Sequence, residues 1–356
     1  MSHHNEFSLI LAKNCVYDWV NDKKHERDPR WRNLPCLDAS IRDDAPKPKR
    51  WLRFLDKLWR DDEASKDLLH EFMGLTLTVD TSFQKMLLLF GPPKAGKGTI
   101  IRILTEIHGR DNVAVTPSIA SLGKSFGLQP LLNKSVATII NARFSEKDID
   151  NGINRLLNIT GEDYVMVNLR HRAAIPAIQL FARFVVSTNE LPVRHDCADD
   201  ALYSRFLILQ FTSSFEGRED SGLQDALSKE KDGILQLMVD GLRRLYRQGF
   251  TRTSYQEALT NDLEKIGSPF RAFVQKRCEF GKDKWVPVQK LYEEWRKWRG
   301  YDMTQPRNGG DAWQFRRDIM MAFPTVHRGE KHGVPGQCYF GIALRDDDAA
   351  TDAESS

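Results

Sequence analysis

The residues with the plainest chemical meaning lie between Gly91 and Thr99 and read GPPKAGKGT. Glycine at Gly91 and Gly96 lets backbone N–H groups approach an anion where a Cβ would intrude. Lys97 supplies a cation that can hold the β and γ phosphates of a nucleotide. The predicted ATP-binding loop consists of Gly91, Pro92, Pro93, Lys94, Ala95, Gly96, Lys97, Gly98 and Thr99.

The segments on either side of this loop give it a structural setting. The apolar run Met86–Phe90 is typical of a buried strand, and Thr99–Leu104 is typical of an amphipathic helix. A loop between a strand and a helix directs the N-terminus of the helix at the anion. A structural glycine turn is the alternative, and the flanking elements favour nucleotide binding.

The hydroxyl that usually follows the P-loop lysine is displaced by one residue. Gly98 follows Lys97, and the hydroxyl comes at Thr99. Phosphate binding does not depend on that hydroxyl, because nucleoside monophosphate kinases share the ending GKGT. The displacement weakens the assignment of Thr99 as a ligand of Mg²⁺.

Three apolar runs further along the chain predict buried parallel strands, at 135–140, 184–188 and 206–209. Together with the P-loop unit they predict an α/β fold with a parallel sheet. A P-loop ATPase normally ends the first of these runs with an acidic residue that holds Mg²⁺ through water. Here that run ends in Asn141, which is therefore the second candidate metal residue.

The rest of the chain divides by changes in composition and pattern. A helix is predicted from Phe7 to about Lys23, and a proline-containing linker follows at 45–50. The predicted divisions are an N-terminal extension and linker (1–49), a helical collar (50–80), the ATPase core (81–225), a helical segment packed on it (226–265), a winged-helix-like domain (266–345) and a disordered acidic tail (346–356).

Composition excludes several classes of protein. No apolar stretch approaches the length of a membrane span, and the N-terminus lacks a signal-peptide pattern, so we expect a cytoplasmic protein without a membrane partner. The five cysteines are widely separated, which indicates neither a disulfide framework nor a zinc site. The net charge of +3 is small, but residues 265–345 hold 16 Lys and Arg against 8 Asp and Glu. This basic block is a candidate nucleic-acid surface.

The pattern of the basic block predicts three helices followed by a β-hairpin. The helices are expected at Pro269–Cys278, Val288–Arg299 and Ala312–Met321, and the hairpin leads into Cys338–Leu344. This order suggests a winged-helix domain whose third helix carries Arg316 and Arg317 toward duplex DNA. A protein-docking module is the alternative.

The order of these features resembles the superfamily 3 helicases, in particular the C-terminal helicase region of phage and plasmid primase-helicases of the P4 and D5 type. The motifs that carry the resemblance are FLDKLW, GPPKAGKGT, FGLQPLLNKSVATIINAR, LLNITGEDYVMV, FVVSTNELP and ALYSRFLIL. The resemblance implies a P-loop, AAA+-like ATPase core with a parallel sheet. It also implies an ATP-dependent DNA helicase that forms a ring, typically a hexamer, with ATP and Mg²⁺ bound between neighbouring subunits.

The resemblance also implies roles for single residues. Lys97 and Thr99 would act from one subunit, Asn189 would sense the γ phosphate, and Arg205 would reach the ATP of the neighbour. The alternative for Arg205 is a solvated charge at the start of a strand, without a role in catalysis. A basic hairpin tip would line the channel and grip single-stranded DNA, and its residues are Arg170, His171 and Arg172.

Two departures from the family keep a second function open. Asn141 replaces the family's aspartate, so hydrolysis is expected to be weakened, through either an engineered substitution or a naturally slow ATPase. Only about fifty residues precede the helicase region, so a primase or origin-binding protein would be supplied separately. The competing hypothesis is an ATP-gated DNA-binding scaffold that interferes with or recruits replication proteins without unwinding. A nucleotide kinase fits poorly, because it leaves Asn189 and Arg205 without a role.

Overall fold

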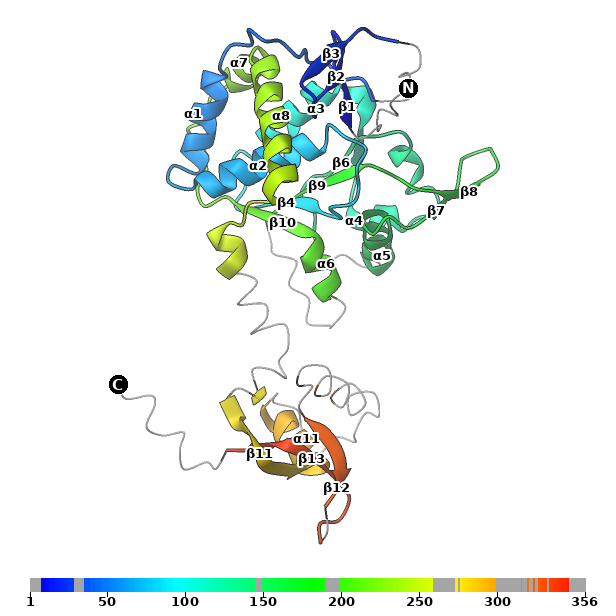
Figure 1. The fold of residues 1–356 in the computed structure, drawn as a ribbon, viewed down its shortest axis with the longest axis vertical. Coiled ribbons are helices and arrows are strands. Elements are labelled where there is room, and N and C mark those ends of the chain that lie inside the picture. The colour runs from blue at the N-terminus through cyan, green and yellow to red at the C-terminus, as the bar shows by residue number, and fades with distance from the viewer. Residues whose placement is uncertain are drawn as a thin grey trace. The chain divides into compact units, whose positions relative to one another are not determined.

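The computed structural model of this chain contains two compact units, which divide between Ala258 and Leu259 (Figure 1). We describe each unit by itself. The residues that the structure describes are 8–28, 35–144, 149–189, 199–258, 273–274, 276–298, 315, 319, 323, 326–331 and 333–345. Within these ranges, no helix is both long and apolar enough to cross a membrane.

The larger unit alternates strands and helices after a short all-β start. Its elements are β1 (Leu9–Leu11), β2 (Val16–Asp18), β3 (Lys23–His25), α1 (Lys49–Leu58), α2 (Glu63–Leu75), β4 (Met86–Phe90), α3 (Lys97–His108), η3 (Arg110–Asn112), β5 (Val113–Thr116), α4 (Ile119–Leu122), η4 (Gln129–Leu131), β6 (Val136–Ile139), α5 (Ile149–Thr160), β7 (Val165–Val167), β8 (Ile175–Ile178), β9 (Arg183–Thr188), α6 (Asp199–Arg205), β10 (Phe206–Gln210), α7 (Leu223–Ser228) and α8 (Lys231–Gln248).

A five-stranded parallel sheet with the strand order β10-β4-β9-β6-β5 forms the centre of this unit. Its inner strands β4, β9 and β6 are almost entirely buried and mostly apolar, because both of their faces are covered. Leu87 and Leu89 of β4 belong to a buried cluster shared with α2, α3 and α8, and Leu88 between them is also fully buried. The predicted α/β core with a parallel sheet is therefore confirmed.

Helices α1 and α2 occupy the segment at 50–80 that the sequence predicted to be helical. The indole N–H of Trp51 in α1 donates to Nε2 of His70 in α2 at 3.0 Å. Burial lowers the pKa of His70 to about 4, so the ring is neutral and accepts this hydrogen bond. The first turn of α1 is capped from elsewhere, because the Glu230 carboxylate accepts the backbone N–H groups of Arg50 and Trp51.

The helix predicted over Phe7–Lys23 is wrong: the described part of this segment forms the antiparallel sheet β1-β2-β3. Hydrogen-bonded turns interrupt this segment and prevent a continuous helix. Ala12 N–H donates to the Cys15 carbonyl, and the Asp18 carboxylate accepts the N–H groups of the two residues that begin the next turn. Asp22 then adopts a left-handed backbone with φ 55°.

This small sheet is part of the core of the larger unit. Ile10, Tyr17 and Ile41 belong to the same buried cluster as Leu87 of the central strand β4. The segment predicted as an extension and linker therefore contributes buried side chains to the unit that carries the P-loop. The finer divisions into collar and helical segment stay predictions.

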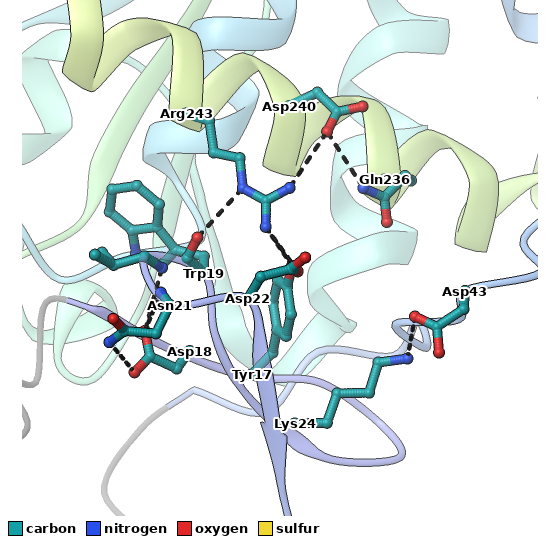
Figure 2. Close-up of polar contacts among 11 residues, drawn as sticks. Tyr17, Asp18, Trp19, Asn21, Asp22, Lys24, Asp43, Gln236, Asp240 and Arg243 are labelled. Atoms are coloured by element: carbon teal, nitrogen blue, oxygen red, sulfur yellow. Dashed lines mark hydrogen bonds and ion pairs between the residues drawn. The ribbon is translucent and has the colours of Figure 1, made fainter.

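Arg243 of α8 joins the small sheet to the helical layer (Figure 2). Its guanidinium donates to the Tyr17 hydroxyl at 2.6 Å, to Asp22 Oδ1 at 2.9 Å and to the Trp19 carbonyl at 3.2 Å. Burial raises the pKa of Tyr17 to about 12, and its hydrogen bond to Asp22 acts in the same direction. Arg243 thus holds β2 and the turn after it against α8.

We expect Arg243→Met to lower the free energy of unfolding by about 1–2 kcal/mol, because it removes the charged donor of the hydroxyl of buried Tyr17 and of the Trp19 carbonyl. Thermal and urea unfolding of the full chain measure the change. Arg42→Met is the control, since the Arg42 guanidinium pairs with exposed Asp44 two residues away. Equal unfolding midpoints for the two variants would contradict this role of Arg243.

The smaller unit contains a three-stranded antiparallel sheet and a helix. Its elements are β11 (Cys278–Pro287), α11 (Val288–Trp298), β12 (His327–Glu330) and β13 (Gln337–Leu344). The sheet order is β11-β13-β12, and Tyr339 of β13 lies in a buried cluster with Leu291 of α11. The predicted helix at 288–299 and the terminal hairpin are confirmed.

Strand β11 does not follow from the sequence pattern. Residues 273–274 and 276–277 are helical, as expected, but Cys278 begins a strand instead of ending a helix. The pairing of β11 with β13 shifts register between Phe280 and Trp285, and Gly281 and charged residues fill the gap. Such an irregular strand has no clean alternation of apolar and polar residues, so its pattern looks like a linker.

Candidate nucleotide-binding site

The P-loop follows β4 directly, as the sequence predicted. Gly91 has φ 149°, and a Cβ at this position would lie 2.3 Å from the carbonyl oxygen of Phe211. Gly96 has φ 97° and precedes the first residue of α3, Lys97. Both positions therefore need glycine, and the N-terminus of α3 provides backbone N–H groups suited to an anion.

Lys97 and Asn189 meet at this loop although they are far apart in the sequence. The Lys97 ammonium donates to Asn189 Oδ1 at 2.8 Å, to the Pro92 carbonyl at 2.7 Å and to the Gly91 carbonyl. The two residues come together because β4 and β9 are adjacent and parallel, with Phe90 opposite Thr188. Burial lowers the pKa of Lys97.

The connections of the sheet change direction at the same point. The chain leaves β4 for β5, at one edge of the sheet, and leaves β9 for β10, at the other edge. Ligands of open α/β sheets bind at the carboxyl ends of adjacent strands whose connections run in opposite directions. Lys97 and Asn189 therefore lie at the position where this class of fold binds its ligands.

Asn141 lies at the carboxyl end of β6, on the same edge of the sheet. Its side chain is exposed, its backbone is left-handed with φ 56°, and its N–H donates to Ser187 Oγ at 3.2 Å. Asparagine and aspartate both tolerate this conformation. Of the acids beyond this strand, Asp150 is in the first turn of α5, and Glu146 and Asp148 are outside the described residues.

The site suits one of its two expected ligands, ATP, better than the other, Mg²⁺. The glycine cradle and Lys97 suit a triphosphate. For Mg²⁺ the predicted residues offer neutral oxygens, those of Thr99 and Asn141, and the Thr99 hydroxyl accepts a hydrogen bond from Arg102 at 3.1 Å. Among the described residues, no group of three or more His, Cys, Asp or Glu side chains is arranged to hold a metal. Mg²⁺ would therefore depend on phosphate and water oxygens, which it commonly does.

Arg205 lies at the opposite end of the sheet from the P-loop. It ends α6 immediately before β10, and β10 runs parallel to β4 with Phe206 opposite Met86. Arg205 therefore lies beside the start of β4, whereas Gly91 follows its end. The five residues of β4 span roughly 16 Å at about 3.3 Å per residue. Arg205 therefore does not reach the P-loop of its own chain.

Two contacts hold the Arg205 guanidinium at this end. It donates to Gln84 Oε1 and to the Thr160 carbonyl, the latter at 3.3 Å. Lys85 lies beside it and donates to the Ser204 carbonyl. Burial lowers the pKa of Lys85, and the charge of Arg205 adds to that effect. Gln84 and Lys85 could not be predicted from the sequence, because no motif marks residues whose partners lie 121 and 119 positions away.

The predicted basic hairpin is formed by β7 and β8, which pair antiparallel. Figure 1 shows it projecting from the body of the larger unit. Arg170, His171 and Arg172 are exposed at its tip. The Arg170 backbone N–H donates to Gln129 Oε1 at 3.2 Å, and its guanidinium lies 5.6 Å from the ring centroid of Phe126.

In the smaller unit, Arg316 and Arg317 lie outside the described residues, so their predicted DNA contact stays a prediction. Phe315 and Ile319, which flank them, are helical and buried in the core. On the β12–β13 hairpin, Arg328 is exposed and Lys331 Nζ lies 3.9 Å from the ring centroid of Trp285.

Comparison with known proteins gives one family match and several structural neighbours. Residues 89–205 match a family described as a family of unknown function (DUF5906). This range runs from the end of β4 to Arg205 and includes the P-loop, Asn141, the hairpin and Asn189.

The structural neighbours include apo structures of the C-terminal region of NrS-1. One, of residues 305–718, has a TM-score of 0.54 and 13% identity and covers 90% of this chain and 79% of that chain. The A form of the same region has a TM-score of 0.52 and 13% identity, with 85% and 77% covered. At this identity the likeness concerns the fold.

Proposed function

We propose that this chain is an ATP-dependent, ring-forming DNA helicase that acts in the replication of a phage, plasmid or other mobile element. The observation that carries the proposal is the separation of Arg205 from the P-loop of its own chain. A guanidinium held at the amino end of the sheet can act on nucleotide only if a second copy brings its own P-loop to that end. Head-to-tail contacts of this kind close into a ring where the rotation between copies closes, and we expect a hexamer.

In this mechanism each residue has a defined task. The P-loop backbone and Lys97 bind the β and γ phosphates, and the Asn189 amide contacts the γ phosphate and the attacking water. Water attacks the γ phosphorus, the bond to the bridging oxygen breaks, and ADP and phosphate leave. The Arg205 of the neighbouring subunit stabilises the charge that spreads over the transferred group. Bound Mg²⁺ would neutralise charge on the phosphates.

Two features support contact with DNA. A ring would bring several copies of the exposed tip Arg170–Arg172 around one strand, where positive charge holds phosphates without reading sequence. In the smaller unit, the order of β11, α11, the helical positions 315 and 319, β12 and β13 agrees with a winged helix. We assign duplex DNA to this unit and single-stranded DNA to the hairpin.

Asn141 favours a second candidate, an ATP-gated DNA-binding scaffold without unwinding activity. An amide at the end of β6 supplies no negative charge near the expected Mg²⁺. Such a protein would bind ATP, form a ring and recruit or block other replication proteins. Under either proposal it acts in the cytosol of a bacterial host, with a primase or origin-binding protein as a proposed partner.

The test measures the mass of the full chain with and without ATP and DNA, beside strand displacement on a forked duplex. We expect a ring with both ligands present. Displacement, in the chain as given or after Asn141→Asp, supports the helicase. We expect Arg170→Ala with His171→Ala to abolish displacement and to leave ATP binding unchanged, because the tip is exposed and its hairpin projects from the body of the unit (Figure 1).

The matched control for the variant at the hairpin tip is Arg155→Ala. This substitution also removes a positive charge, but from α5 and not from the tip. A ring that binds ATP and DNA but displaces no strand, even with aspartate at position 141, supports the scaffold instead. A monomer in the presence of both ligands contradicts both proposals.

A further inference from the structure

The segment Ser214–Asp220, which we call the strap, lies on the apex of the P-loop. It follows β10, whose neighbour β4 leads into the P-loop. The Ser214 hydroxyl donates to the Pro93 carbonyl at 2.9 Å, and the Phe215 N–H donates to the Lys94 carbonyl at 3.0 Å. The strap is thus bonded to the backbone of the loop expected to bind phosphate.

The strap also forms ion pairs with the side chain of Lys94 at the apex of the P-loop. Lys94 has a left-handed backbone with φ 57°, and its ammonium lies 3.1 Å from Glu216 Oε1 and 3.0 Å from Glu219 Oε1. Its side chain is 51% exposed, so solvent and a ligand can both reach it. The hydrogen bonds to Glu219 and Glu216 raise the pKa of Lys94, so the ammonium stays charged while two carboxylates share it.

The far end of the strap is tied to α1. Asp220 Oδ2 pairs with the Arg50 guanidinium at 3.3 Å. Farther along α1, Phe54 and Leu58 lie 3.2 Å from the position that a Cβ of Gly96 would occupy. The strap therefore contacts the apex of the P-loop and links to the helix that packs against its last glycine.

We infer that Lys94 is a second phosphate-binding cation beside Lys97, and that Glu216 and Glu219 compete with the nucleotide for it. This inference rests on the proposed function, because it assumes that the P-loop binds a triphosphate. Binding then exchanges two carboxylate partners of Lys94 for phosphate oxygens, and the strap sets the affinity of the site.

The test titrates the full chain with a fluorescent ATP analogue and Mg²⁺. We expect Glu216→Gln with Glu219→Gln to lower the Kd about 3- to 10-fold, which is the range for two exposed ion pairs. The gain should shrink as salt is raised from about 50 to about 300 mM, because salt screens exposed charges. Lys94→Met should raise the Kd, since it removes the cation and leaves both carboxylates.

Combining the two changes separates competition for Lys94 from a general effect of negative charge. If the carboxylates act through Lys94, neutralising them should improve binding less in the Lys94→Met background than in the original chain. An equal improvement in both backgrounds overturns the role of Lys94. Asp38→Asn is the matched control, because Asp38 also pairs with two lysines, Lys13 and Lys231, but contacts the far end of α3.

The outcomes also separate this inference from the proposed function. Binding by the original chain with no tightening in the double glutamine variant overturns the strap and leaves the nucleotide site intact. No binding by any variant overturns the nucleotide site, and the strap inference fails with it.

Discussion

Asn141→Asp is expected to raise the rate of ATP turnover by about 10- to 100-fold, the range over which outer-shell groups of metal sites affect activity. The new carboxylate would add the negative charge that helps to hold Mg²⁺ and to polarise the attacking water. The fold should accept it, because Asn141 is exposed and aspartate tolerates the left-handed backbone at φ 56°. The affinity for ATP should change much less, since Lys97 and the glycine cradle supply most of the phosphate contacts.

Steady-state release of phosphate at saturating ATP measures this change. Asn133→Asp is a close control: Asn133 is exposed, has φ 58° and lies just before β6, at the opposite end of the strand from Asn141. We expect no gain from it. Equal and substantial turnover in the original chain and in Asn141→Asp would contradict our interpretation of this position. Tight ATP binding without turnover in either would favour the scaffold.

The parts of this fold that sequence predicted are those whose signal is local. The strand, loop and helix around Lys97 are contiguous, and each central strand is an apolar run that both faces of the sheet require. The α/β core and the P-loop could therefore be predicted from residue order alone.

The parts that sequence missed depend on contacts between distant residues or on irregular geometry. The N-terminal sheet is made of three-residue strands, too short for a period of two to show, and Arg243 holds it from more than two hundred residues away. The partners of Arg205 and of Lys94 are likewise set by the adjacency of β4 and β10. No pattern along the chain marks Gln84 or Glu216, because each gains its role from a neighbour in space.

Arg205 offers the most demanding test of the ring, because its effect should cross from one subunit to the next. In the Asn141→Asp background, Arg205→Ala is expected to lower ATP turnover on the order of 10³-fold or more, as loss of an arginine finger does. Lys97→Ala should abolish turnover by removing phosphate binding. If both residues served the same chain, a mixture of the two variants would be as inactive as each alone.

A shared site predicts that the mixture recovers activity. An Arg205→Ala subunit still has Lys97, and a Lys97→Ala subunit still has Arg205, so roughly one interface in four of a randomly mixed ring is intact in a head-to-tail assembly. Subunits are mixed before ATP and DNA are added, and phosphate release is followed. Mixing Lys97→Ala with the double variant is the control, because no interface there joins an intact Lys97 to an intact Arg205. Recovery confined to the first mixture would require that nucleotide is bound between two copies of the chain. We expect this result because Arg205 lies a full strand length from the P-loop of its own chain.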